Sequence, residues 1–161
     1  MLILALLGGL FSILAFIHFA SDFILQSHNE AMIKHNHPKI RAKHCIIYTI
    51  SFFPIFWYSA FYWWEWLIAI NLLFWSHFYL DTYHIVYLWA KYIRRPPEMV
   101  EPRKQTGVDG YIMILPPDPK IGFMEFVQTP LGKILSIAID QISHLTFLLP
   151  IVYLMKNHFK K

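Results

Sequence analysis

Long blocks of apolar residues alternate with two polar stretches along the chain. Four of these blocks approach or exceed the ~18 residues that a helix needs to cross a ~30 Å hydrocarbon layer. They cover residues 2–25, 45–63, 66–90 and 134–155. Continuous apolar runs of this length favour helices, because a helix satisfies its own backbone hydrogen bonds in lipid. The pattern predicts an all-α membrane protein in which residues 1–161 form one domain, a bundle of four transmembrane helices.

Prolines and aromatic residues mark where these spans bend and end. Pro54 and Pro150 lie inside the second and fourth spans, where proline kinks a helix because it removes a backbone donor. Aromatic residues crowd the link between the second and third spans: Tyr58, Tyr62, Trp63, Trp64 and Trp66. Such side chains are enriched at membrane–water interfaces. This link is therefore expected to be a tight turn at the membrane surface.

The two polar stretches are residues 27–44 and 91–133. The second contains seven of the ten prolines, so it is predicted to be an irregular loop with one short helix near residues 122–127. Together the two stretches hold eleven of the fourteen Lys and Arg residues. The excess of Lys and Arg in cytoplasmic loops then places both stretches in the cytoplasm and both termini outside.

Composition supports a membrane protein and excludes some kinds of site. Of the 161 residues, 57% are apolar and 15% are charged, against about a quarter charged in a typical soluble domain. The single cysteine, Cys45, rules out a disulfide framework and a cysteine-based zinc finger. The motifs of zinc-dependent proteases, P-loop NTPases and serine hydrolases are absent.

Histidine and aspartate residues recur inside the apolar blocks. The first block holds His18, Asp22 and Gln26 at four-residue spacing, and the third holds His77, Asp81 and His84. The second begins near His44, one turn before Tyr48, and the fourth holds Asp140, Gln141 and His144. Residues three or four apart share one face of a helix. Each isolated ionisable group in a membrane costs at least ~2.5 kcal/mol, so these residues are expected to face inward and meet.

Imidazole and carboxylate groups that meet in a bundle are the ligands that zinc uses. The predicted metal ligands are His18, Asp22, His77, Asp81, Asp140 and His144. Asp140 and His44 are the candidate catalytic residues, and Gln26, Tyr48 and Gln141 are expected to lie behind the ligands. The sequence leaves three functions open: a metal-dependent hydrolase of a lipid or phosphoester, a non-catalytic bundle held by His–Asp hydrogen bonds, and a small ion or proton carrier.

The polar stretches suggest partners for the chain. Their basic residues lie directly beside apolar spans, so they favour anionic lipid headgroups over nucleic acid. His28, His35 and His37 lie in the first stretch and are expected to be solvated. The proline-rich stretch, residues 91–133, is a candidate docking surface for a protein partner or a second copy of the chain.

A resemblance covers all four apolar blocks. It rests on the pattern His18-x3-Asp22-Phe-x2-Gln26, Ala31, Lys34, His44-x3-Tyr48, His77-x3-Asp81-x-Tyr83 and Asp140-Gln141-x2-His144. This pattern resembles an uncharacterised membrane family of bacteria and phages, domain of unknown function 3307. The resemblance implies an inner-membrane protein with these polar residues as its signature, and it implies no reaction. His84 stands where the family pattern has a lysine, and the proline-rich stretch looks like an insertion.

Overall fold

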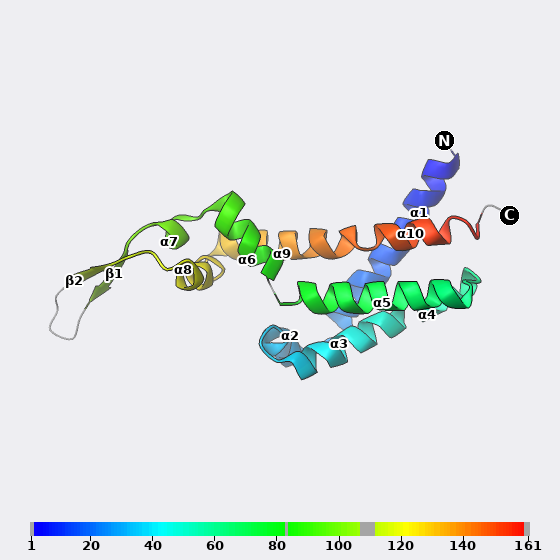
Figure 1. Ribbon diagram of the computed structural model, residues 1–161, viewed down its shortest axis with the longest axis horizontal. Coiled ribbons are helices and arrows are strands. Elements are labelled where there is room, and N and C mark those ends of the chain that lie inside the picture. Colours follow the sequence, from blue (N-terminus) through cyan, green and yellow to red (C-terminus); the bar gives the residue numbers. More distant parts are fainter. Residues whose placement is uncertain (1, 83, 107–111, 160–161) are drawn as a thin grey trace. The chain divides into compact units, whose positions relative to one another are not determined.

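The computed structural model describes residues 2–82, 84–106 and 112–159, and it is mostly helical (75%). Its contacts divide the chain into two compact units. Unit 1 comprises Met1–Thr82 and Ile142–Lys161, and unit 2 comprises Tyr83–Gln141. The two units are described in turn (Figure 1).

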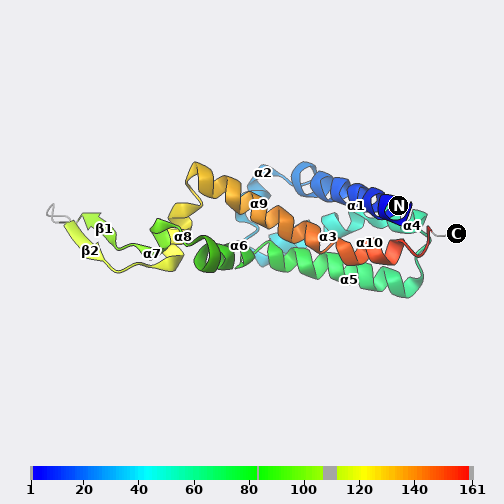
Figure 2. The same cartoon turned by 90° about the horizontal axis from the view of Figure 1, so that it is seen from above.

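Unit 1 is helical throughout its described elements. These are α1 (Leu2–Phe19), the π-helical turn η1 (Ala20–Ile24), α2 (His28–Ile33), α3 (Pro38–Ser51), α4 (Phe53–Tyr58), α5 (Trp63–Leu80), the end of α9 (Pro130–Thr146) and α10 (Leu149–Met155). α3 packs along α5, and α1 packs against α10 (Figures 1 and 2). Three helices that are distant in sequence, α1, α3 and α5, are thereby brought together in one unit.

The expected proline kinks appear as short breaks between helices. Pro54 lies in the first turn of α4 and Pro150 in the first turn of α10. In both cases the preceding helix ends a few residues before the proline, because proline lacks the N–H that would bond to the previous turn. The second and fourth apolar blocks therefore each contain two helices.

The core of unit 1 is apolar and rich in aromatic rings. Its buried members are Leu10, Leu14, Tyr48, Phe52, Phe56, Phe61, Ala69, Leu73, Leu148, Ile151, Val152 and Met155. The rings of Phe56 and Phe61 stack at 5.1 Å between centroids, and Trp66 meets Phe56 edge-on at 5.7 Å. Burying a large apolar side chain stabilises a fold by about 1.5–3 kcal/mol. This core provides a rigid base for the polar side chains described below.

Unit 2 contains the proline-rich stretch. Its elements are α6 (His84–Trp89), the π-helical turn η2 (Ala90–Arg94), α7 (Pro97–Val100), β1 (Arg103–Thr106), β2 (Ile112–Leu115), α8 (Pro119–Phe126) and the start of α9. Ala90, Met99 and Phe126 form its small core. Gly122 allows α8 to approach α7 closely, because a Cβ atom there would collide with the Glu98 carbonyl oxygen.

The short helix expected near residues 122–127 is present as part of α8. The strands β1 and β2 were not expected: they pair antiparallel, with Arg103 opposite Leu115 and Thr106 opposite Ile112. The chain is therefore mostly helical rather than all-α. A two-stranded hairpin has weak sequence signals, because it needs only a few extended residues on each side of a turn.

A bundle of four transmembrane helices is not supported. Two helical stretches within the described residues, Ile3–Ile24 and Pro130–Met155, are long and apolar enough to cross a membrane. The block at residues 45–63 divides between α3 and α4, and the block at 66–90 is interrupted after Leu80. Polar residues within α5, among them Glu65, also lower its apolar character.

Candidate metal centre

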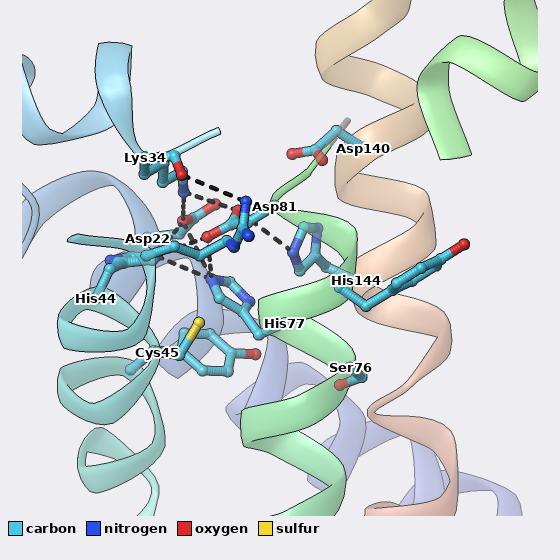
Figure 3. A network of polar contacts seen from close by, with 12 residues as sticks. Asp22, Lys34, His44, Cys45, Ser76, His77, Asp81, Asp140 and His144 are labelled. Carbon is cyan, nitrogen blue, oxygen red and sulfur yellow. Dashed lines mark hydrogen bonds and ion pairs between the residues drawn. The ribbon is translucent and has the colours of Figure 1, made fainter. Parts of the chain in front are cut away.

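Four ionisable side chains from three segments of unit 1 point toward one another (Figure 3). They are Asp22, His44, His77 and Asp81, here called the four-donor cluster. Asp22 lies in η1, His44 in the middle of α3, and His77 in the last turn of α5. Asp81 is the residue that ends α5, one turn after His77. The extra residue in the π-helical turn η1 is a local distortion of a kind often found at functional sites.

The distances within the four-donor cluster are close to those of a tetrahedral metal site. His44 Nε2 lies 2.9 Å from His77 Nε2, 3.1 Å from Asp22 Oδ1 and 3.7 Å from Asp81 Oδ2. His77 Nε2 lies 3.7 Å from Asp22 Oδ1 and 3.6 Å from Asp81 Oδ2. Ligand bonds of 2.0–2.2 Å arranged as a tetrahedron separate the ligand atoms by about 3.3–3.6 Å. One atom from each of the four residues could therefore bind the same ion.

The four-donor cluster is almost fully removed from solvent. His77 and Asp81 are each 1% exposed, His44 is 4% exposed, and Asp22 is 9% exposed. Among the described residues, Asp81 Oδ2 is buried without a hydrogen-bond partner, although it faces both imidazoles. A buried carboxylate oxygen without a partner is costly, and a bound cation would satisfy it.

Lys34 forms ion pairs with both carboxylates of the cluster. Its Nζ lies 2.9 Å from Asp81 Oδ1 and 3.3 Å from Asp22 Oδ1 (Figure 3). Burial alone would lower the pKa of Lys34, but the carboxylates of Asp81 and Asp22 outweigh it and raise the pKa above its ordinary value. Lys34 is therefore a permanent positive charge beside the cluster.

His35, in the segment that joins α2 to α3, and Arg41, near the start of α3, support the same region. His35 Nδ1 donates a hydrogen bond to the Asp81 backbone oxygen at 2.6 Å. Burial lowers the pKa of His35 to about 4, so this ring is neutral at physiological pH. Arg41 donates to the His35 backbone oxygen at 2.9 Å, and its guanidinium lies 4.4 Å from the centre of the Phe78 ring.

Three further rings surround the cluster. Tyr48 stacks on His77 with 3.8 Å between ring centroids, and its hydroxyl lies 3.1 Å from His18 Nδ1. His144 lies 4.4 Å from His77 and 5.4 Å from His18, centroid to centroid. His144 Nε2 is also 3.9 Å from Asp81 Oδ1. Four histidines from α1, α3, α5 and α9 thus meet in unit 1.

The structure brings together most of the residues expected at the site. His18, Asp22, His77, Asp81 and His144 lie in one group, as the helical spacing suggested, and Tyr48 lies behind them. His44, expected to be a catalytic group, lies among the four donors instead. The assignment of each as a ligand remains a prediction.

Other expected residues lie outside this group or outside its unit. Gln26 follows the end of η1, and its amide nitrogen is buried without a hydrogen-bond partner among the described residues. Asp140 and Gln141 belong to unit 2, where the Gln141 side-chain amide donates to Asp140 at 3.2 Å. His84 also belongs to unit 2, because the helix ends before it, and Tyr83 lies outside the described residues.

Two residues of the site were not expected from the sequence. His28 and His37 are exposed as predicted, but the prediction was wrong for His35, which is half-buried against Asp81. Lys34 was interpreted as a basic loop residue, although it is buried at 6% exposure. The burial of Lys34 could have been predicted from the family pattern, which includes this lysine together with the His and Asp residues. A positive charge can pair with the carboxylates of that pattern.

A family model described as "Protein of unknown function (DUF3307)" matches residues 10–160. No curated protein and no solved structure matches the chain significantly.

Proposed function

Because the chain belongs to the DUF3307 family, whose description assigns no activity, we propose a function from the site: a membrane protein that binds a divalent cation. The observation that carries this proposal is the four-donor cluster, whose ligand atoms all lie within 4.8 Å of one another. Two nitrogens and two oxygens in this arrangement fit zinc, which is bound tetrahedrally by His and Asp. Calcium and magnesium prefer six or more oxygen ligands, so they fit this set less well.

The metal content of the purified full-length protein tests the proposal. We expect about one zinc ion per chain, and loss of that ion in His77→Ala and in Asp81→Asn. His28→Ala is the matched control, because His28 is exposed and does not belong to the donor set, and it should retain the metal. Circular dichroism of each variant separates loss of the ion from loss of the fold.

Cobalt provides a second readout of geometry. Tetrahedral cobalt(II) absorbs visible light far more strongly than octahedral cobalt(II), so cobalt-loaded protein should show an intense visible band. Wild-type protein that folds but contains no stoichiometric metal and gains no such band would overturn the metal proposal.

The alternative is a hydrogen-bonded network that holds the helices together without metal. It is favoured by the 2.9 Å contact between His44 Nε2 and His77 Nε2, which needs a proton on one of the two nitrogens. His77 Nδ1 has no hydrogen-bond partner among the described residues, so a proton on Nε2 suits this ring in the absence of metal. Stoichiometric metal in the wild type would decide against this alternative.

Several finer assignments remain proposals. Hydrolysis of a lipid or phosphoester, with Asp140 and His44 as catalytic residues, requires turnover that disappears in Asp140→Asn. An ion or proton carrier would instead produce flux across liposomes. An inner-membrane location is proposed from the family resemblance, and cytoplasmic loops are proposed from the charge pattern of the sequence. A docking role for residues 91–133 is proposed from their proline-rich composition.

A further inference from the structure

The charged groups of the four-donor cluster do not balance before any metal is added. Asp22 and Asp81 supply two negative charges, and Lys34, which contacts both carboxylates, supplies one positive charge. The histidines of the cluster add no charge when they are neutral, which is the form that binds metal. The unloaded group therefore carries one net negative charge.

A divalent cation would leave this group with one excess positive charge. Uncompensated charge in a buried environment is unfavourable. Two changes could restore the balance: Lys34 could leave, or an anion could enter with the metal.

The contacts of Asp81 favour the second change. Its Oδ1 atom accepts from Lys34 at 2.9 Å, whereas its Oδ2 atom faces the imidazoles of His44 and His77 at 3.7 and 3.6 Å. One carboxylate can thus hold the ammonium and the metal at the same time, on different oxygens. Lys34 need not be displaced when the metal binds.

Lys34 is also placed to contact a second ligand. An ammonium has three N–H donors, and the carboxylates of Asp22 and Asp81 account for two of them. Asp22 and Lys34, at 9% and 6% exposure, are less deeply buried than the other members of the cluster. In a two-metal site, two metal ions clamp a phosphate group between them. The Lys34 ammonium would share both carboxylates with the bound metal, so it occupies a position like that of the second metal ion.

On these grounds, and resting on the proposed metal site, we infer that the loaded centre takes a phosphate-type oxyanion between the metal and Lys34. A singly charged phosphate group cancels the excess charge. One of its oxygens would bind the zinc as a fifth ligand, a number to which zinc can expand, and another would accept from the ammonium. The oxyanion is either free phosphate or the phosphomonoester headgroup of a lipid, and both offer the same group to the site.

The test measures the affinity of the full-length protein for zinc with and without inorganic phosphate, at matched ionic strength, against a competing chelator. Because coupling between two ligands is reciprocal, an oxyanion that binds only the loaded site must tighten metal binding. We expect phosphate to raise the zinc affinity of the wild type at least tenfold.

Lys34→Met identifies the residue responsible. Without the ammonium, zinc should bind more tightly in phosphate-free buffer, and phosphate should change the affinity less than twofold. Lys34→Arg keeps the charge and should retain part of the phosphate effect. Lys43→Met is the matched control, since the Lys43 side chain is 62% exposed and bonds to Glu30, and it should behave as the wild type does.

A second arm distinguishes the sources of the oxyanion. The protein is placed in nanodiscs of phosphatidylcholine with or without phosphatidic acid, and zinc affinity is measured in phosphate-free buffer. A gain with phosphatidic acid alone assigns the site to a lipid headgroup, and a gain with inorganic phosphate as well assigns it to phosphate in general. Stoichiometric zinc whose affinity responds to neither compound overturns the inference and leaves the metal site intact, whereas absence of zinc overturns the proposed function itself.

Discussion

One contact sets His35 apart from its neighbours His28 and His37. All three lie in the same basic segment, but only His35 is held against the backbone of Asp81. This contact forms because the segment after α2 folds back onto the end of α5, and it leaves His35 half-buried.

The lowered pKa of His35 predicts a dependence of stability on pH. Its pKa is about 4 in the folded protein and 6.5 in its ordinary state. Between these values the unfolded chain takes up a proton at His35 and the folded chain does not, so the free energy of unfolding decreases as the pH falls from 6.5 toward 4. Chemical unfolding in detergent at several pH values measures this decrease.

His35→Asn is the matched variant for that experiment. The asparagine amide can donate to the Asp81 oxygen in place of Nδ1, but it has no proton to gain in this range. The wild type should therefore lose stability relative to His35→Asn as the pH decreases. A difference that stays constant from pH 7 to pH 4 would contradict a buried neutral His35.

The ends of the helices explain why the four-residue spacing located part of the site but not where the site ends. His18 and Asp22 share a face across the junction of α1 and η1, so the four-residue spacing succeeded there. It did not extend to His84, which belongs to unit 2 because α5 ends before it. Apolar runs do not reveal such endings when aromatic and aliphatic residues continue past them.

Glu65 stabilises the start of α5 and the segment after α10 together. Its carboxylate accepts from the Tyr62 backbone N–H at 2.8 Å and lies 2.8 Å from His158 Nε2, and Glu65 is 3% exposed. Glu65→Gln keeps the shape but removes the charge, so we expect a loss of roughly 1.5 kcal/mol of unfolding free energy. Thermal unfolding in detergent measures it.

Two controls accompany that variant. Glu30→Gln breaks an exposed pair with Lys43 and should change stability little. Glu65 is separated from His77 by about 18 Å along α5, so Glu65→Gln should retain its metal. Loss of zinc together with stability would mean that the two ends of α5 are coupled in a way that the contacts do not explain.

For the whole molecule, the apolar pattern predicted the helical class but not the number of spans. Four blocks looked sufficient by length, yet only Ile3–Ile24 and Pro130–Met155 are helical stretches of spanning length and character among the described residues. A block is defined by its apolar residues alone, whereas a span also requires the helical stretch that contains them to be long and apolar enough as a whole. The apolar pattern also did not predict the hairpin of β1 and β2, because short strands in a proline-rich stretch have no strong periodicity.

These two helices predict how the protein partitions. We expect the full-length chain to remain in the membrane fraction after an alkaline carbonate wash and to be released by detergent. A central arginine in a spanning helix costs about 2.5–3.5 kcal/mol, so Leu14→Arg should weaken this retention. Leu14 is fully buried in the structure, and Phe16→Arg, at an exposed position of the same helix, separates a packing defect from an insertion defect. Quantitative release of the wild type by carbonate would contradict a membrane-spanning chain.

The chain passes between the two units at two points, and both lie close in sequence to buried polar side chains of unit 1. Asp81 is the second-last residue of the segment that leaves unit 1, and His144 is the third residue of the segment that returns to it. Tension applied along the chain from unit 2 therefore reaches Asp81 or His144 within three residues.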